Sequence, residues 1–174
     1  AGDRLDEAGT VNALVPRLKT QSIKAIVVLI HEGGAQPAPA PYNGCTGLSG
    51  AIVDIVQRLD PEVDVVISGH THKAYNCILD DKLVTSAASY GRLLTDIDLT
   101  LDRSTGEIVG IVANNTIVTR DVPKDGAITA LIEKYKVIAS PLARRSIGSI
   151  TADITRRRNA AGESALGDVI ADSQ

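Results

Sequence analysis

The sequence is poor in aromatic side chains: it has no phenylalanine and no tryptophan, and only four tyrosines. It also has no methionine. Aromatic residues supply much of the buried area of cores and pockets, so a complete enzyme of 174 residues without Phe or Trp is unusual. We therefore expect a piece of a longer polypeptide, truncated at both ends. The alternative is an unusual composition in a protein rich in Ala and Val.

Two further absences exclude classes of function. The 18 basic residues are outnumbered by 21 acidic ones, which gives a net charge of −3. Without a basic excess, we expect no binding to a nucleic-acid duplex, whose phosphates attract clustered Lys and Arg. The longest apolar run, residues 25–30, is far shorter than the roughly 20 residues that a membrane helix needs. No membrane span is therefore expected.

Two apolar runs, residues 23–30 and 63–68, predict buried strands that each end in a polar turn. Both runs are rich in Val and Ile, as is typical of a sheet covered by helices on both faces. Apolar residues at helical spacing predict helices over residues 6–21 and 48–59. The alternation of helices and buried strands indicates an α/β fold.

The pattern changes after residue 74. Short strand-like runs separated by turns predict an antiparallel meander. Its strands cover residues 75–79, 82–86, 93–101 and 108–119. Beyond it we predict a helix over 126–140, a short strand over 147–154 and a helix over 165–174. The apolar side of the first of these helices is expected to face inward, and it consists of Ile128, Leu131, Ile132, Tyr135 and Ile138.

All three histidines lie beside glycines just after the two buried strands. His31 follows the first strand, and His70 and His72 follow the second. The carboxyl ends of strands are where open α/β sheets build their sites. Side chains two apart on an extended segment point the same way, so His70 and His72 could serve one metal or two adjacent metals. Imidazole suits zinc and other first-row divalent metals. The alternative is a set of turn histidines that only form hydrogen bonds.

Four segments together resemble a known family. The Ser-Gly-His-Thr-His run at 68–72 resembles the terminal metal motif of calcineurin-like metallophosphoesterases, and the His-Glu-Gly-Gly run at 31–34 resembles their middle histidine motif. Residues 88–97 narrow the resemblance to the 5′-nucleotidase family, which includes UDP-sugar hydrolases and 2′,3′-cyclic phosphodiesterases. Residues 163–174 resemble the opening helix of that family's C-terminal substrate domain. The resemblance covers almost the whole chain.

The resemblance implies a partial metallophosphoesterase α/β sandwich. Residues 1–122 would be the C-terminal half of the metallophosphoesterase domain and residues 123–143 a linker helix. Residues 144–174 would be the incomplete start of the substrate domain. The N-terminal half of the same domain would then precede residue 1 and act as a partner of this chain.

The resemblance also implies a metal-dependent phosphoesterase that hydrolyses nucleotide phosphate esters. Two divalent metals, such as Zn or Mn, would lower the pKa of a bridging water and clamp the phosphoryl oxygens. His31 and His70 would bind one metal and His72 the other. The bridging Asp, the Asn ligand and the general-acid His would come from the missing half. This chain would then contain no catalytic residue and would be inactive alone.

Two alternatives to this function stay open. The chain could be a non-catalytic, metal-binding fragment. It could also be a mononuclear zinc hydrolase in which His31, His70 and His72 form a three-histidine site with an open water position. Asp54 and Asp64, the nearest acidic residues, lie within or before predicted elements, and we interpret both as structural.

The two cysteines, Cys45 and Cys77, approach the same sheet edge in the predicted order of elements. Pairing is therefore plausible, with free thiols or zinc ligation as alternatives. A disulfide implies an oxidising compartment. This agrees with the extracellular, periplasmic or cell-surface location that the resemblance implies.

Overall fold

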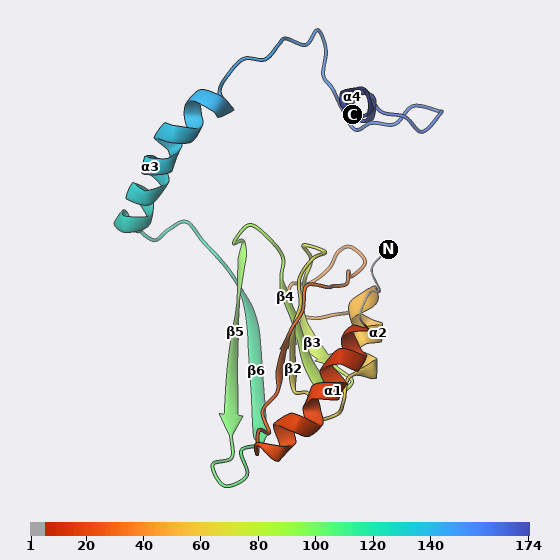
Figure 1. Ribbon diagram of the computed structural model, residues 1–174, viewed down its shortest axis with the longest axis vertical. Coiled ribbons are helices and arrows are strands. Elements are labelled where there is room, and N and C mark those ends of the chain that lie inside the picture. The colour runs from red at the N-terminus through yellow and green to blue at the C-terminus, as the bar shows by residue number, and fades with distance from the viewer. Residues whose placement is uncertain (1–5) are drawn as a thin grey trace. The chain divides into compact units, whose positions relative to one another are not determined.

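The computed structural model describes residues 6–174, and the chain divides into two compact units after Asp121 (Figure 1). The first unit combines two helices, a four-stranded sheet and a two-stranded sheet; the second holds two helices. The elements of the first unit are α1 (Glu7–Thr20), β1 (Val27–Leu29), α2 (Ala51–Arg58), β2 (Val65–Ile67), β3 (Ala74–Leu79), β4 (Lys82–Ala87), β5 (Leu93–Leu101) and β6 (Ile108–Ile117). Those of the second are α3 (Gly126–Ala143) and α4 (Ala165–Ser173).

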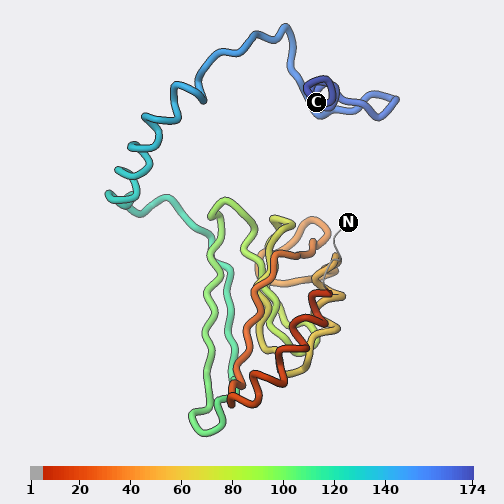
Figure 2. Tube along the Cα trace, in the orientation of Figure 1, coloured from red at the N-terminus to blue at the C-terminus, as the bar shows by residue number. Residues whose placement is uncertain are grey.

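The larger sheet has the strand order β1-β2-β4-β3. Strands β1, β2 and β4 are parallel, and β3 returns antiparallel to β4. Helices α1 and α2 lie beside one another against this sheet, as the trace in Figure 2 shows. Their buried side chains, such as Val15 and Ile52, join Val66 and Val84 of the sheet in one apolar core. The mixed α/β fold predicted from the sequence is confirmed.

Local chemistry fixes where α1 begins and what it contacts. Asp6 is its N-cap, and the Asp6 carboxylate accepts a hydrogen bond from the Gly9 amide at 3.0 Å. Asn12, one turn further on, donates to the carbonyl of Arg58 at 2.8 Å and accepts from the amide of Asp60 at 2.7 Å. These bonds tie α1 to the end of α2.

The prediction that the first apolar run is buried on both faces is wrong. The strand β1 covers only three residues of that run, and Val27 and Leu29 are 44% and 76% exposed. Helices α1 and α2 cover one side of the sheet, and β1 has a single strand neighbour, β2, among residues 6–174. An apolar run indicates that a strand prefers to be buried. It does not indicate which other elements will cover the strand, because that depends on the tertiary structure.

The predicted meander divides between the two sheets. The β3–β4 hairpin extends the larger sheet. Within residues 6–174, β5 and β6 pair only with each other, with Leu93 opposite Ile117. Alternate residues of this hairpin are exposed, including Leu94 and Val112. The strands themselves form where the alternating sequence predicts them.

The side chain of Asn115 on β6 ties the two sheets together. It is 1% exposed. Its amide group donates to the carbonyls of Tyr42, Tyr75 and Ser86 at 2.7, 3.2 and 3.2 Å, and its oxygen accepts from Thr95 Oγ1 at 2.5 Å. Buried polar groups stabilise a fold when they are fully bonded. Asn115 therefore fixes the β5–β6 hairpin against the larger sheet.

The second unit differs from the sequence prediction in two respects. The apolar side of α3 does not face inward: Ile128, Leu131 and Tyr135 are each at least 50% exposed, and no element among the described residues covers them. The predicted strand over 147–154 is not formed, because no other strand of the described chain pairs with it. Helix α4 begins where Ser164 Oγ accepts from the Gly167 amide at 3.1 Å. No helix in the described part of the chain has the length and apolar character needed to cross a membrane.

Asp64 joins the start of β2 to β1 through Ile26 and to β4 through Leu83, whose amide donates to the Asp64 carbonyl at 2.9 Å, which supports its structural interpretation. Its carboxylate accepts a hydrogen bond from the Ile26 amide at 2.8 Å, and its own amide donates to the Ile26 carbonyl at 3.0 Å. Partial burial raises the pKa of the Asp64 carboxyl; the bond from Ile26 opposes this, and the nearby charges of Glu107 and Glu62 raise it further. The fold therefore binds this proton more readily than the unfolded chain does.

We expect Asp64→Asn to keep the Ile26 bond and to be at least as stable as the wild type at neutral pH. Because the folded pKa is raised, wild-type stability should fall relative to the variant as the pH rises from about 4 to 7. Urea unfolding across this range measures the difference. The control Asp64→Ala loses the bond and should be less stable by about 1–3 kcal/mol. An Asn variant as unstable as the Ala variant would show that the negative charge itself is needed.

Candidate metal centre

The site lies where two parallel strands end side by side. In the β1–β2 pair, Val27 is opposite Val65 and Leu29 is opposite Ile67, and the Ile30 amide extends the pairing by donating to the Ile67 carbonyl at 3.0 Å. The loops that follow both strands therefore leave the sheet at the same edge. These loops carry the histidines of the sequence motifs.

Two of the three histidines meet at this edge. His31 Nε2 and His70 Nδ1 lie 3.3 Å apart, and the two rings are edge-on, with centroids 5.1 Å apart. Both side chains are exposed. Two imidazole nitrogens bound to one tetrahedral zinc at 2.0–2.1 Å would be about 3.3–3.4 Å apart. The spacing of the pair therefore fits two ligands of one metal ion, and it also fits the alternative of a hydrogen bond between the two rings.

Glycine permits the close approach of the two loops. A Cβ on Gly33 would lie 2.2 Å from the carbonyl oxygen of Gly69, a distance that no side chain tolerates. The Gly69 amide donates to the Glu32 carbonyl at 3.1 Å, and Thr71 Oγ1 donates to the Gly34 carbonyl at 2.7 Å. The residues that flank His31 and His70 thus hold the two loops in register.

The predicted reason for pairing His70 with His72 is wrong. The two residues are not on an extended segment: their φ angles are +64° and +58°, in the left-handed region. His72 instead lies against Tyr90, with ring centroids 5.8 Å apart. Residues 6–174 contain no group of three or more His, Cys, Asp or Glu side chains placed to hold a metal ion. The structure therefore brings together His31 and His70, but not all three histidines.

A disulfide fixes the long loop that follows His31. Cys45 and Cys77 are joined, with Cα atoms 5.8 Å apart, so neither cysteine is a free thiol. Next to the disulfide, Asn43 Oδ1 accepts hydrogen bonds from the backbone N–H of Asn115 at 2.7 Å and from Asn76 Nδ2 at 3.0 Å. The loop is thereby fastened to β3 and β6.

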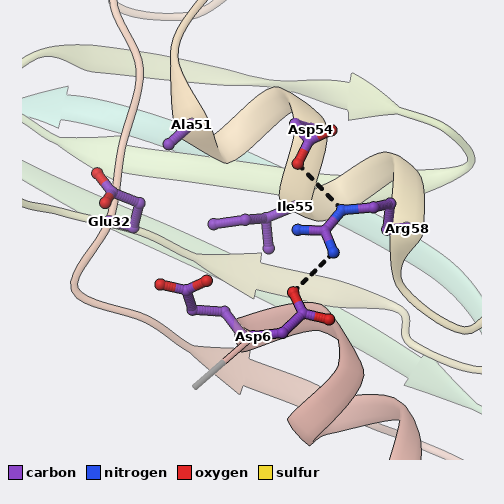
Figure 3. A pocket seen from close by; sticks show the side chains of 7 residues that line it. Asp6, Glu32, Ala51, Asp54, Ile55 and Arg58 are labelled. Carbon is purple, nitrogen blue, oxygen red and sulfur yellow. Dashed lines mark hydrogen bonds and ion pairs between the residues drawn. The ribbon is translucent and has the colours of Figure 1, made fainter. Parts of the chain in front are cut away.

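An acidic hollow of about 220 Å³ lies beside the histidine loop (Figure 3). Its lining residues are Asp6, Glu7, Glu32, Ala51, Asp54, Ile55 and Arg58. Arg58 donates to Asp6 Oδ1 at 2.6 Å and to Asp54 Oδ2 at 3.0 Å, as the dashed lines show. The hydrogen bond from Arg58 lowers the pKa of the Asp6 carboxyl. Asp54 is thus structural, as its position in the sequence indicated, because its carboxylate is paired with Arg58 one turn along α2.

Sequence reasoning missed two residues near the third histidine. Tyr90 contacts His72, and the guanidinium carbon of Arg92 lies 5.7 Å from the centre of the Tyr90 ring. Both residues lie in the segment 88–97 that carries part of the family resemblance. The sequence did not indicate that this segment folds back to the histidine turn.

Two curated relatives match nearly the whole chain. The chain is 31% identical to endonuclease YhcR of Bacillus subtilis over 168 residues, which is 96% of the chain and 13% of that protein. It is 31% identical to the cell wall protein Lmo0130 of Listeria monocytogenes over 189 residues, which is 99% of the chain and 24% of that protein. The chain therefore spans a small part of each relative. No protein-family model matches the chain.

Solved structures show the same fold. A 5′-nucleotidase precursor from Thermus thermophilus superposes with a TM-score of 0.66 at 22% identity, covering 97% of this chain and 34% of that one. The calcineurin-like phosphoesterase YfkN from Bacillus subtilis gives a TM-score of 0.62 at 20% identity, covering 80% of this chain and 45% of that one. The chain thus has the metallophosphoesterase fold of 5′-nucleotidases and calcineurin-like phosphoesterases, over part of their length. The resemblance predicted from the motifs is confirmed.

Proposed function

We propose that this chain is the C-terminal half of a metallophosphoesterase domain, followed by a linker helix and the start of a substrate domain. Together with the preceding half, it would hydrolyse phosphate esters of nucleotides. The observation that carries the proposal is the 3.3 Å separation of His31 Nε2 and His70 Nδ1 at the carboxyl edge of two parallel strands. The fold shared with phosphoesterases supports it.

In this proposal His31 and His70 hold one divalent metal, such as Zn or Mn, and His72 holds a second. When bound, two such metals activate a water and neutralise the phosphoryl oxygens of the substrate. Neutral imidazole ligands add no negative charge, which favours an anionic phosphate ester. The bridging carboxylate and the leaving-group acid would come from the preceding half.

The position of His72 argues against a self-sufficient zinc hydrolase. A three-histidine site needs all three imidazoles around one ion. Only His31 and His70 are within that distance, and His72 lies against Tyr90. Two adjacent imidazoles without a third ligand fit a metal centre shared with the preceding half of the domain better than they fit a complete zinc site.

We also propose that the protein acts outside the cytoplasm, in an extracellular, periplasmic or cell-surface setting. Disulfides persist in oxidising compartments. Both cysteines of this chain are paired, and one relative is named a cell wall protein.

Metal uptake by residues 1–174 tests the proposed ligands. We expect weak binding of Zn or Mn, because two adjacent imidazoles are an incomplete set. His31→Ala and His70→Ala should each weaken uptake by at least about tenfold, and His72→Ala should have a smaller effect. Gly33→Ala should act like the first two, because its Cβ would force the two loops apart. Equilibrium dialysis with metal analysis gives the affinities.

The exposed Lys73, next to His72, offers the matched control: Lys73→Ala should leave uptake unchanged. Metal content that is unchanged in a His31→Ala, His70→Ala double variant would rule out this ligand assignment.

A further inference from the structure

A buried tyrosine on β3 reaches both of the loops that carry the paired histidines. The Tyr75 side chain is fully buried in the core that the larger sheet forms with α1 and α2. Its ring packs among apolar side chains, but its hydroxyl is polar, and a buried polar group needs hydrogen-bond partners. A phenylalanine would fill the same space without this requirement. The partners of the hydroxyl therefore indicate what Tyr75 does besides packing.

The Tyr75 hydroxyl connects the loop after β1 to the end of β2. It accepts a hydrogen bond from the Gly34 amide at 3.3 Å and lies 2.5 Å from Ser68 Oγ. Ser68 Oγ donates its only hydrogen to the Thr85 carbonyl at 2.7 Å, so the Tyr75 hydroxyl is the donor to Ser68. A continuous chain of hydrogen bonds thus runs from the first histidine loop, through Tyr75, to the end of β2 and to β4.

Both polar backbone groups of Gly34 are bonded to hydroxyls from other segments. Its amide donates to Tyr75, and its carbonyl accepts from Thr71 Oγ1, in the turn directly after His70, at 2.7 Å. Gly34 is buried, so the loss of either hydroxyl would leave a polar backbone group without a hydrogen bond. The two hydroxyls therefore fix the loop of His31 against the loop of His70.

We propose that Tyr75 is a positioning residue for the metal centre. Its hydroxyl bonds to both loops, so it sets how closely the imidazoles of His31 and His70 approach one another. Metal affinity depends on the groups that orient the ligands as well as on the ligands, and loss of such a group typically costs about 10–100-fold. The assignment rests on the proposed function, because it requires the two histidines to bind one metal.

The zinc affinity of residues 1–174, measured by equilibrium dialysis, tests the proposal. Tyr75→Phe keeps the ring and loses only the hydroxyl, and it should bind zinc at least about tenfold more weakly than the wild type. Ser68→Ala should have a similar effect. The double variant should bind no more weakly than Tyr75→Phe alone, since both changes break one chain of hydrogen bonds. Thr71→Val should also weaken binding, whereas Thr71→Ser, which keeps the hydroxyl, should not.

Thr95→Val is the matched control, because it removes the hydrogen bond of another partly buried hydroxyl at a distance from the histidines. Thr95 Oγ1 donates to Asn115 Oδ1 on the β5–β6 hairpin. The control should lower the urea midpoint about as much as Tyr75→Phe does, and it should leave the zinc affinity unchanged. Equal losses of zinc affinity in the two variants would overturn the proposal, because the effect would then follow stability and not the placement of the loops.

A measurement without metal separates the role of Tyr75 from the choice of metal ligands. In the metal-free wild type, NMR should detect nuclear Overhauser contacts between the rings of His31 and His70, whose centroids are 5.1 Å apart. These contacts should weaken in Tyr75→Phe and persist in Thr95→Val. Unchanged contacts in Tyr75→Phe would overturn the positioning role. If the contacts depend on Tyr75 but the wild type binds no zinc, the metal assignment of the proposed function fails, and the control of the histidine pair by Tyr75 is supported.

Discussion

We expect residues 1–174 alone to hydrolyse neither AMP nor a nitrophenyl phosphodiester above the buffer rate, even with added Mn or Zn. Phosphate ester hydrolysis needs an activated water, stabilisation of charge on the phosphoryl oxygens and a proton for the leaving group. The described chain brings together His31 and His70 and holds no third ligand beside them. It therefore supplies at most part of the first requirement.

Supplying the preceding half of the domain, in trans or in the longer protein, should raise the rate at least about a thousandfold above the buffer. A nitrophenyl ester is the most sensitive probe, because its leaving group needs little protonation. His31→Ala in the completed protein should remove this gain, and Lys73→Ala should keep it. Robust, His31-dependent turnover by residues 1–174 alone would contradict the shared metal centre and favour a three-histidine zinc hydrolase.

Loss of the Cys45–Cys77 disulfide should destabilise the first unit by about 3–4 kcal/mol, the chain-entropy estimate for a bond spanning 32 residues. The bond closes the loop between the His31 motif and β3, so its removal frees the unfolded chain more than the folded one. The Cys45→Ser, Cys77→Ser variant, unfolded in urea and followed by circular dichroism, measures the loss.

Reductant provides the control. Dithiothreitol should lower the stability of the wild type to that of the double variant and leave the variant itself unchanged. The hydrogen bonds of Asn43 to Asn115 and Asn76 remain in both, so the folded loop should keep its place. Equal stability of oxidised and reduced wild type would show that the bond does not constrain this unit, and would remove the disulfide's support for an oxidising compartment.

Much of the local structure could be predicted from the sequence because it depends on neighbours along the chain. The alternation of apolar residues placed β5 at Leu93–Leu101, and helical spacing placed α1 within its predicted range. The meeting of His31 and His70 was also predictable in outline, since both follow strands of β-branched residues and parallel strands end at one edge.

Contacts between distant segments could not be predicted. In the sequence, nothing distinguishes Asn115 from other polar residues of a strand. Only the fold places the carbonyls of Tyr42, Tyr75 and Ser86 around its side chain. The exposure of Val27 and Leu29 was missed for the same reason: a residue's apolar character does not specify what covers it.

The sequence by itself determined the α/β pattern, the motifs and the strand ends that carry the histidines, since periodicity and turn chemistry are local. Only the tertiary structure decided which histidines meet. Left-handed backbone angles at His70 and His72 replace the extended geometry that the spacing implied. One histidine thereby meets His31 and the other meets Tyr90, because the loop after β1 and the turn after β4 pack on either side of the same motif.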